Sequence, residues 1–573
     1  MSNWTAGENL SPERMQRLSA DIPTTYTIFK QGTTYYAETN DPSGTYYNGT
    51  NAKTLIQQAI DACGSSGGRI HFQRGTFTLD AAPTISNPLV VTGEGKETIF
   101  KIDDNALCSA FRIEGTSGVA LRDFYVDGNK ANNTYVSGTH YTIEFDDDGV
   151  AGCTDCLVDG VWVENGSDGI MIHSALSGSP TKRMIVNNCQ LNSNDFVGVV
   201  ACGYGNETTI SNCVCYNNSW WGIELCGTAH QGVLIQGCQI VDNVRRGIVV
   251  GHGNSFSIMN NYVRGSNAAD YYCVDVTCAD SGGVGGDDSV ITGNIIEDGK
   301  YGILATKDQE QPYRLVISNN AIYDFYYNGI YLNYVNDAVV SNNVIKGTSG
   351  TTYNGIHAKQ VYDSSIMGNV IQHGQSTGIL LDDASRNVVV GNNIRNYNRG
   401  IKQDTSTYNH IVGNYLYNND KGITEIDSSD YSSYSGNMPY NSTTAAYDLI
   451  GTHNIYDGKE RTATSVDLSG GADILVVFQS EEPRFIPRAT VVYTEASSGD
   501  AGITIEIGKA NGTTDRDYYY TGTTAVSQAQ WTNTQLTLLK NDVAAGDTVT
   551  FYSAGGKTGT GEIMLVLDWL MSR

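Results

Sequence analysis

Residues 389–404, VVGNNIRNYNRGIKQD, contain two short motifs that return along most of the chain. The first is an Asn between branched apolar residues, as in VVGNNI, and the second is a Gly followed by Ile, here Gly400-Ile401. Related copies of the first motif are ITGNII, ISNNAI, VSNNVI and IMGNVI, with IVGNYL as a looser version. Self-similarity at a regular period is typical of repeat proteins, in which each repeat is one structural unit.

The Gly-Ile motif sets the length of the repeat. Neighbouring copies lie 22 to 29 residues apart, except across a wide gap that holds one further coil near Tyr272-Cys273-Val274. A period of this size supplies three short strands and three turns, enough for one coil of a β-solenoid whose strands pair with the next coil about 4.8 Å away. The copies are Gly169-Ile170, Gly198-Val199, Gly222-Ile223, Gly247-Ile248, Gly302-Ile303, Gly329-Ile330, Gly355-Ile356, Gly378-Ile379, Gly400-Ile401 and Gly422-Ile423.

One position per repeat predicts a ladder of side chains inside the turns. A buried Asn at a turn can bond through its amide to the turn of the next coil, whereas a Cys fills the same space without needing a partner. The sequence shows neither the Leu consensus nor the helix per repeat of leucine-rich proteins. The ladder positions are Cys189, Cys213, Cys238, Asn261, Asn294, Asn320, Asn343, Asn369, Asn392 and Asn414.

Charge and composition exclude several classes of function. The formal charge of −26 disfavours nucleic acid and anionic membranes as general partners. No apolar run of about 18 residues predicts a membrane span, and the first residues show no signal-peptide pattern. All 12 cysteines lie between Cys63 and Cys278. Most of them, including the pair Cys153 and Cys156, are interpreted as core residues rather than disulfides or zinc ligands.

The first coil carries a family resemblance. Residues 51–63 predict a short amphipathic helix that would cover the open end of the solenoid. The segments AKTLIQQAID, GGRIHFQRGTFTL and VVTGEG resemble the opening of the pectate-lyase-like superfamily, and the resemblance extends from Gly49 to Tyr440. It implies a right-handed parallel β-helix. The superfamily includes polysaccharide lyases, hydrolases, epimerases and phage tailspikes, so the resemblance leaves the chemistry open.

The sequence predicts three regions. Residues 1–48 form an N-terminal segment with a short helix that starts near Ser11, and residues 49–456 form the β-helix. From about Asp457 the repeat gives way to seven or more strands with apolar and polar residues alternating, which predict a C-terminal antiparallel β-sandwich over 457–573.

Candidate chemistry lies on the strands that begin with Gly-Ile. In such a strand the Ile points inward, and the residues two and four after the Gly point outward. One outward cluster covers three consecutive coils and comprises His357, Lys359, Asp382, Lys402 and Asp404. Their backbones would lie about 5 Å apart from coil to coil, within reach of one sugar ring. Lys-Asp pairs across coils are equally the ordinary surface pairs of a solenoid.

A second cluster contains Glu224 and Asp275, with His173 and His252 nearby. Two coils separate the acids, so their backbones would lie roughly 9–10 Å apart. That separation suits an inverting glycosidase, with Glu224 as acid and Asp275 as base. Aromatic residues that could stack on sugar rings flank both clusters, namely Trp220, Trp221, Tyr271, Tyr272 and Tyr331.

The sequence therefore predicts a polysaccharide-binding and polysaccharide-cleaving enzyme, with hydrolysis and elimination both open. Elimination on a uronan would use His357 or Lys359 as base and Lys402 or Ca²⁺ to neutralise the sugar carboxylate. No residue is assigned as a metal ligand. Asp146-Asp147-Asp148 is interpreted as a solvated acidic turn, with a cation site as the alternative. The alternative function is a tailspike-like glycan receptor, extracellular or virion-associated, for which a homotrimer is the expected state.

Overall fold

The computed structural model describes residues 25–449 except 42, 148, 228–230, 252, 266–270, 279–286, 308–311 and 349–352. Beyond these it describes residues 454–456 and the backbone of the later strands. The chain forms two compact units, Met1–Phe325 and Tyr326–Arg573. Among the described residues, no helix has the length and apolar character that crossing a membrane requires.

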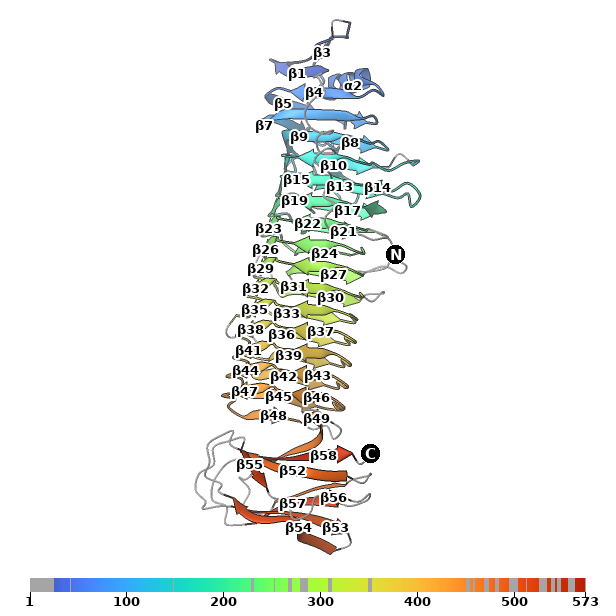
Figure 1. Ribbon diagram of the computed structural model, residues 1–573. Coiled ribbons are helices and arrows are strands. Elements are labelled where there is room, and N and C mark those ends of the chain that lie inside the picture. Colours follow the sequence, from blue (N-terminus) through green and yellow to red (C-terminus); the bar gives the residue numbers. More distant parts are fainter. Residues whose placement is uncertain are drawn as a thin grey trace. The chain divides into compact units, whose positions relative to one another are not determined.

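The first unit is a parallel β-helix, as the repeats predict (Figure 1). Each coil contributes one strand to each of three walls, and every strand pairs in parallel with its counterpart in the next coil. The strands of the wall that carries the Gly-Ile motif, called the Gly-Ile wall, are β6 (Thr84–Ile85), β8 (Phe111–Glu114), β10 (Tyr141–Asp146), β13 (Asp168–Ser174), β17 (Val199–Gly203), β21 (Trp221–Cys226), β24 (Arg246–Val250), β27 (Tyr272–Cys278) and β30 (Tyr301–Lys307).

The other two walls of this unit consist mostly of three-residue strands. The second wall contains β4 (Gly68–Phe72), β11 (Leu157–Asp159), β15 (Ile185–Asn187), β19 (Thr209–Ser211), β22 (Leu234–Gln236), β25 (Ser257–Met259), β28 (Val290–Thr292) and β31 (Val316–Ser318). The third wall contains β5 (Gly75–Leu79), β12 (Trp162–Glu164), β16 (Gln190–Asn192), β20 (Val214–Tyr216), β23 (Gln239–Val241), β26 (Tyr262–Arg264), β29 (Ile295–Glu297) and β32 (Ala321–Tyr323). The long strands β7 (Leu89–Ile102) and β9 (Ala120–Asp127) run through both walls, and β14 (Thr181–Lys182) pairs separately with β18 (Gly205–Asn206).

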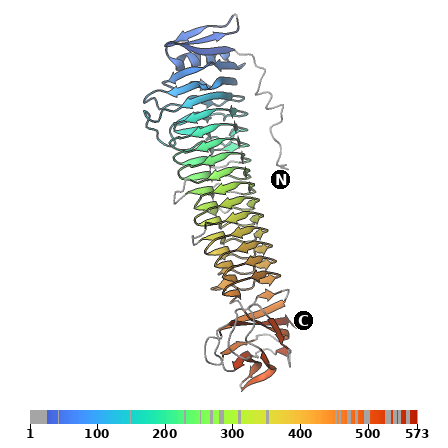
Figure 2. The same ribbon diagram turned by 90° about the vertical axis from the view of Figure 1, so that its left-hand side faces the viewer.

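The N-terminal end of the β-helix is covered by a helix and a short antiparallel sheet (Figures 1 and 2). The strands β1 (Tyr26–Gln31), β2 (Thr34–Thr39) and β3 (Tyr47–Gly49) are antiparallel, and β1 also pairs in parallel with β4. Helix α2 (Ala52–Cys63) begins at the N-cap Asn51, whose side chain accepts a bond of 2.8 Å from the Thr54 N–H. Its buried face shields the first coil from solvent and from edge-to-edge pairing.

The second unit repeats the three-walled coil. Its Gly-Ile wall contains β33 (Asn328–Asn333), β36 (Asn354–Lys359), β39 (Thr377–Asp382), β42 (Arg399–Asp404), β45 (Lys421–Ile426) and β48 (Ala445–Asp448). Its second wall contains β34 (Val339–Ser341), β37 (Ser365–Met367), β40 (Val388–Val390), β43 (His410–Val412), β46 (Ser433–Ser435) and β49 (Ile455–Tyr456). Its third wall contains β35 (Val344–Lys346), β38 (Val370–Gln372), β41 (Asn393–Arg395), β44 (Tyr415–Tyr417) and β47 (Met438–Tyr440).

The last strands of the second unit are antiparallel. Strands β50 (Lys459–Asp467) and β52 (Arg484–Tyr493) both pair with β58 (Glu562–Met571), and β52 also pairs with β55 (Asn533–Leu536) and β56 (Asp542–Val543). Strands β51 (Ile474–Gln479), β57 (Thr548–Ala554), β53 (Ile503–Asn511) and β54 (Thr513–Thr524) form a separate four-stranded sheet. The change from parallel to antiparallel pairing coincides with the end of the sequence repeat.

The glycine of the Gly-Ile motif is needed because successive coils come very close at this position. A Cβ at Gly378 would lie 2.2 Å from Ile394 Cγ2 and 2.7 Å from the carbonyl oxygen of Gly400, the equivalent glycine of the next coil. Gly198 has the same relation to Gly222, at 2.6 Å. Stacked glycines therefore allow the coils to approach each other, and a methyl group would force them apart.

The predicted ladder is present inside both units. In the second unit the Asn369 side chain and backbone N–H groups both donate to Asn392 Oδ1 at 3.0 Å, and those of Asn392 donate to Asn414 Oδ1 at 2.9–3.0 Å. Each Asn side chain thus forms hydrogen bonds with the polar groups of the turns in the neighbouring coils, so that these buried groups have partners. In the first unit, the buried thiols of Cys189, Cys213 and Cys238 occupy the same positions and donate to backbone carbonyls at 3.2–3.7 Å.

Candidate functional site

The strand register of the first unit aligns the predicted acids in one outward column. Glu224 pairs with Val249, and Val249 pairs with Asp275, so the two acids lie two coils apart as the sequence predicts. Apolar residues separate Glu224 from the charged residues at the other end. In chain order the column is Arg112, Glu144, Met171, Val200, Glu224, Val249 and Asp275.

Aromatic side chains form a shelf beside Glu224. Met171, Val197 and Val200 are buried at its base, beneath rings and thiols that remain partly exposed. Rings pack edge to face here, with a centroid distance of 4.9 Å between Phe196 and Trp220. The partly exposed members, which we call the aromatic shelf, are Tyr141, Phe196, Cys202, Trp220, Trp221 and Cys226. Both tryptophans of the sequence-based set therefore belong to this surface.

Glu224 is a carboxyl group that holds its proton at neutral pH. Burial raises its pKa to about 8, and the negative charges of Cys202 and Asp168 act in the same direction. A hydrogen bond with Cys226 and the positive charge of Arg246 only partly oppose this increase. A protonated carboxyl group next to an aromatic surface has the properties of a general acid for a bound sugar.

Asp168 is a second unusual carboxyl group, and sequence reasoning missed it. Burial raises its pKa to about 7, while a 3.0 Å hydrogen bond from the Val197 N–H to Oδ1 stabilises the ionised form. Its strand β13 lies two strands before β21, which carries Glu224. The signal was available, because Asp168 is the one acid that directly precedes the glycine in the ten repeat copies of the Gly-Ile or Gly-Val motif.

Asp275, the predicted base, is completely buried rather than exposed. Its side chain has 0% exposure and forms an ion pair with Arg246 at 2.5 Å between Nη1 and Oδ2, and it also accepts a hydrogen bond from Thr277. Burial raises the pKa of Asp275, although Arg246 acts in the opposite direction. Asp275 therefore lacks the contact with water that a base in hydrolysis needs. It instead positions Arg246, whose guanidinium lies 5.0 Å from the Tyr272 ring centroid.

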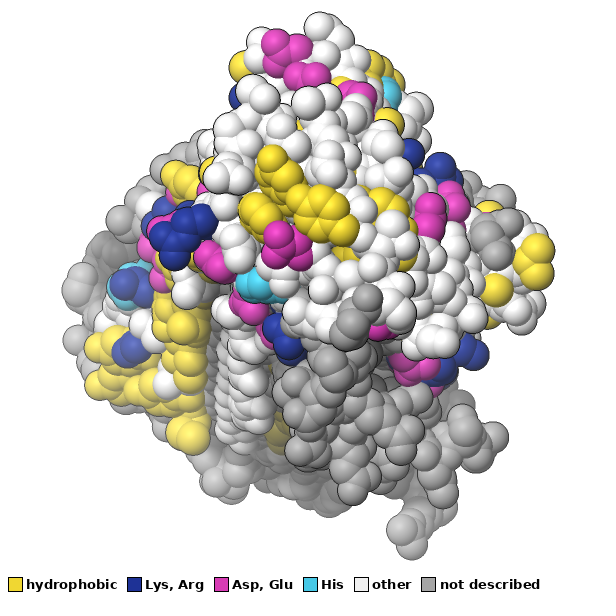
Figure 3. Space-filling view, turned by 90° about the horizontal axis from the view of Figure 1, so that it is seen from above, with side chains coloured by type: hydrophobic (Ala, Val, Ile, Leu, Met, Phe, Trp, Pro, Cys, Tyr) yellow, Lys and Arg dark blue, Asp and Glu magenta, His cyan; other side chains and the backbone are white. Residues whose placement is uncertain are grey.

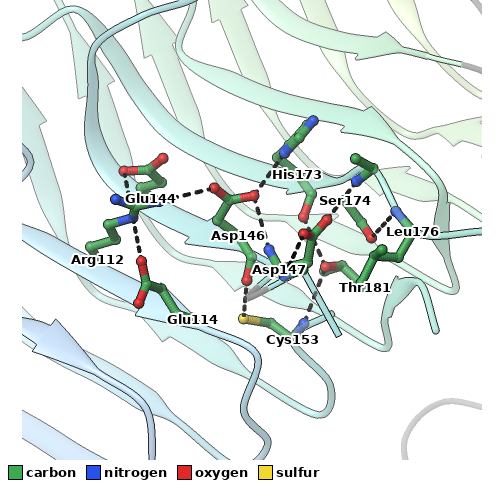
Figure 4. Close-up of polar contacts among 12 residues, drawn as sticks. Arg112, Glu114, Glu144, Asp146, Asp147, Cys153, His173, Ser174, Leu176 and Thr181 are labelled. Atoms are coloured by element: carbon green, nitrogen blue, oxygen red, sulfur yellow. Dashed lines mark hydrogen bonds and ion pairs between the residues drawn. The ribbon is translucent and has the colours of Figure 1, made fainter. Parts of the chain in front are cut away.

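A third group of polar residues lies beside the aromatic shelf (Figure 4). His173 Nδ1 lies 2.8 Å from Asp146 Oδ1, and this hydrogen bond raises the pKa of His173. Asp147 Oδ2 accepts a bond of 2.6 Å from the Ala175 N–H, and Arg112 lies 3.4 Å from Asp146. Donor atoms of Asp146, Asp147 and His173 lie within 4.8 Å of one another and could hold a divalent cation. Asp148 lies outside the described residues.

The cluster of the second unit is built from paired charges. His357 Nε2 lies 3.3 Å from Asp382, which Lys359 also approaches at 4.0 Å, and Lys402 binds Asp404 at 2.9 Å. Burial lowers the pKa of His357 and outweighs the opposing effect of Asp382. The imidazole is therefore neutral near pH 7 and can accept a proton. The Tyr331 ring packs against it at 4.9 Å.

The predicted ligand-stacking residues divide into two groups. Trp220, Trp221, Tyr272 and Tyr331 are partly exposed on the Gly-Ile walls. Tyr271 is a correction, because its side chain is completely buried and points into the coil, where Gly247 lies against its hydroxyl group. One residue separates inward from outward positions in a strand, so Tyr271 and Tyr272 face opposite sides. His252 lies outside the described residues.

Two family models match parts of the chain. Residues 109–268 match the model described as a right-handed beta helix region, and residues 278–458 match the model described as periplasmic copper-binding protein NosD. These matches identify the right-handed parallel β-helix that the motifs predict. Among the described residues of 278–458, no three His, Cys, Asp or Glu donor atoms lie within 4.8 Å of one another.

Several solved structures resemble the chain at low identity. The mannuronan C-5 epimerase AlgE4 A-module of Azotobacter vinelandii is 18% identical, with a TM-score of 0.33, and the match covers 71% of this chain and 96% of that one. The α-1,3-glucanase of Streptomyces thermodiastaticus is 14% identical, with a TM-score of 0.44, and the match covers 59% of this chain and 63% of that one. The tailspike of E. coli bacteriophage HK620 is 11% identical, with a TM-score of 0.44, and the match covers 91% of this chain and 89% of that one. These values are too low to assign an activity, and no curated protein sequence matches the chain.

Proposed function

We propose that the chain binds a polysaccharide across the aromatic shelf and hydrolyses it with Glu224 as the general acid. The observation that supports this proposal is a carboxyl group with a pKa of about 8 beside Trp220 and Trp221. The rings supply faces for sugar stacking, and the protonated Glu224 supplies the proton that the leaving glycosidic oxygen requires.

Asp168 is the proposed partner carboxylate. It replaces Asp275, because the carboxylate of Asp275 already forms an ion pair with Arg246. Asp168 is buried as well, with 4% of its surface exposed. In the strand register Glu224 lies two coils beyond Met171, and Asp168 lies three residues before Met171. The backbones of Asp168 and Glu224 are therefore about 14 Å apart, so their side chains must extend toward each other to shorten this gap. Inverting enzymes separate their carboxyl groups by about 6.5–9.5 Å to leave room for water. An ionised Asp168 would activate this water while Glu224 protonates the leaving group.

The surface character favours an uncharged glycan. Seen from the end that carries β1–β3, the visible described surface consists largely of backbone and of side chains that are neither charged nor hydrophobic, with hydrophobic patches and scattered charges between them (Figure 3). The chain carries a net charge of −26, which repels a long polyanion. Neutral polysaccharides are therefore the preferred class of proposed substrate.

A second candidate reaction is elimination on a uronan at the second-unit cluster. The neutral imidazole of His357 could remove a proton, and Lys359 and Lys402 supply positive charge for the sugar carboxylate. Ca²⁺ is the cofactor that this route would use. Both lysines already pair with aspartates, so a substrate carboxylate must compete for them. This competition makes hydrolysis at Glu224 the preferred proposal.

A glycan-binding spike without catalysis is the third candidate. In that role the last antiparallel strands, β50–β58, would form the predicted sandwich and hold three chains together outside a cell or on a virion. Light scattering after size-exclusion separates this candidate from the enzyme. A stable trimer without loss of substrate supports the spike, whereas a monomer that depolymerises glycans supports the enzyme.

The deciding experiment uses a panel of neutral and uronic polysaccharides, with and without Ca²⁺. New reducing ends without new ultraviolet absorbance indicate hydrolysis, and absorbance from an unsaturated sugar indicates elimination. We expect Glu224→Gln to lower the hydrolysis rate by about 100-fold or more. Glu164→Gln is the matched control, since Glu164 lies on the third wall and accepts a bond of 3.2 Å from the Tyr125 hydroxyl. Equal activity of the two variants would exclude Glu224 as the acid.

Binding is tested separately with Trp221→Ala. We expect affinity for the cleaved glycan to fall roughly two- to tenfold, as removal of one stacking ring implies. Trp162→Ala is the control, because Trp162 lies on the third wall beneath Lys96, whose Nζ is 3.8 Å from the ring centroid. Equal loss of affinity in both variants would show that the shelf is not the binding surface.

A further inference from the structure

Exposed aromatic side chains gather on the third wall of the second unit. On strands β44 and β47, Tyr415 pairs with Met438 and Tyr417 pairs with Tyr440. All four residues occupy outward positions, with exposed fractions of 41% for Tyr415, 37% for Tyr417, 60% for Met438 and 62% for Tyr440. We call these four residues the tyrosine platform. Large apolar side chains that remain exposed together on adjacent strands indicate a binding surface.

The three tyrosine rings of the platform are nearly parallel. The ring centroid of Tyr417 lies 5.7 Å from that of Tyr440, with 11° between the ring planes. It lies 6.2 Å from that of Tyr415, with 6° between the planes. Because the planes share one orientation, a flat ring of a ligand can lie parallel to all three. The apolar faces of sugar rings stack on aromatic rings in this way.

Amide side chains border the platform. Asn418 comes directly after Tyr417, and its exposed side chain donates from Nδ2 to Asn396 Oδ1 at 2.8 Å. Asn441 comes directly after Tyr440, and its exposed side chain donates in the same way to Asn418 Oδ1 at 2.8 Å. Each amide nitrogen carries two hydrogens, and this ladder uses one of them. The second N–H is therefore available to a hydroxyl group of a ligand.

The same wall carries hydrogen-bond donors and no carboxylate. Arg395 pairs with Tyr417 in the strand register and is partly exposed, and its Nε has no hydrogen-bond partner among the described residues. None of the ten outward residues on the five strands of this wall is acidic. Hydrolysis of a glycosidic bond requires two carboxyl groups, so a glycan held here would be bound without being cut. The outward residues are Val344, Lys346, Val370, Gln372, Asn393, Arg395, Tyr415, Tyr417, Met438 and Tyr440.

A neutral sugar chain fits this surface better than a second copy of the protein does. Sugars are amphipathic, with apolar C–H faces for the tyrosine rings and hydroxyl groups for the amide and guanidinium donors. A stable protein interface takes about 20–30 residues on each side, at least twice the number of outward residues on this wall. Two copies would also each carry a net charge of −26, which opposes their association.

We propose that the tyrosine platform is a second, non-catalytic binding site for a neutral polysaccharide. Tyr417 and Tyr440 supply the stacking faces, and Arg395 and Asn418 donate hydrogen bonds to the sugar hydroxyl groups. The platform belongs to the second unit, whereas the aromatic shelf belongs to the first. Binding at the platform does not depend on catalysis by Glu224.

The test is electrophoresis of the purified protein through native gels that contain laminarin, dextran, galactomannan or polygalacturonate. The dependence of migration on polysaccharide concentration gives the dissociation constant. We expect at least one of the three neutral polysaccharides to retard the wild type. The double variant Tyr417→Ala/Tyr440→Ala should raise this dissociation constant about fourfold or more, since the loss of each stacking ring weakens binding roughly two- to tenfold. Tyr417→Phe/Tyr440→Phe keeps both rings and should bind like the wild type.

The control is Tyr216→Ala, which should bind like the wild type. Tyr216 lies on the third wall of the first unit with 46% exposure, and it forms no ring contact with a described residue. Circular dichroism verifies the fold of every variant. Equal retardation of the wild type and the alanine double variant would overturn the proposal, as would retardation by polygalacturonate alone or by no polysaccharide. A smaller oligomer of the double variant in light scattering would assign the platform to a second copy of the chain and overturn the proposal as well.

Trp221→Ala in the same gels separates the platform from the aromatic shelf. Loss of retardation in the tyrosine double variant alone would support the platform and contradict binding at the shelf. Loss of retardation in Trp221→Ala alone would overturn the platform and leave the shelf in place. Weaker retardation in both variants would support two binding sites on one chain.

Discussion

At the scale of single residues, environment separates carboxyl groups that look alike in the sequence. Glu224 and Asp275 occupy the same outward column. A hydrogen bond with Cys226 and the charge of Arg246 only partly oppose the effect of burial on the pKa of Glu224, whereas Asp275 forms an ion pair with that arginine. Burial favours the protonated form of any acid, and a contacting cation favours the ionised form. Glu224 is therefore the candidate proton donor, and Asp275 stabilises a charged side chain.

These environments predict a narrow pH optimum. Asp168, with a pKa of about 7, is ionised only above that pH, so a base function is lost below it. Glu224, with a pKa of about 8, is protonated only below that pH, so its acid function is lost above it. We expect a bell-shaped profile of kcat/KM for hydrolysis, centred between about pH 7 and 8. A rate that keeps rising above pH 9 would contradict the assignment of Glu224.

At the scale of structural elements, the turn ladder and the stacked glycines hold successive coils in register. Their contributions differ in kind. The Asn ladder satisfies buried backbone and amide groups, and the glycines remove steric bulk where coils touch. Each can be tested by a single substitution at a fully buried position.

Replacing Asn392 with Ala should strongly destabilise the protein. The substitution removes the acceptor of the Asn369 backbone N–H and the side-chain donor to the Ile366 carbonyl. An unsatisfied buried polar group costs about 1–3 kcal/mol, so we expect a loss of about 3 kcal/mol or more in the free energy of unfolding. Urea denaturation followed by circular dichroism measures it. Asn393→Ala, at the adjacent outward position, should change stability by less than about 0.5 kcal/mol. A similar loss of stability in both variants would show that the Asn ladder does not stabilise the coils.

Replacing Gly378 with Ala tests the close approach of the coils. The new methyl group would lie 2.7 Å from the Gly400 carbonyl oxygen, so the backbone must move. We expect a loss of about 1–3 kcal/mol or more, measured by the urea midpoint. Gly178→Ala is the control, because a Cβ there meets nothing within 4 Å. If Gly378→Ala were as stable as this control, chain flexibility rather than packing would explain the motif.

At the scale of the whole molecule, the charge of −26 sets which glycans can approach. Repulsion between exposed charges is screened within about 10 Å at 0.1 M salt. We expect the affinity for a neutral glycan to stay constant as salt is raised, and the affinity for a uronan to increase. Binding isotherms at two ionic strengths measure both. A uronan affinity that falls with salt would instead show that local cations such as Lys359 and Lys402 dominate its binding.

The sequence alone determined the coil, its inward ladder and the column in which Glu224 lies. These features follow from the local period of the chain, since residues one repeat apart must stack once the backbone coils. The raised pKa of Asp168, the burial of Asp275 against Arg246 and the inward ring of Tyr271 required the tertiary structure. Burial, ion pairing and pKa depend on side chains that different coils bring together, and the pattern within one repeat does not contain that information.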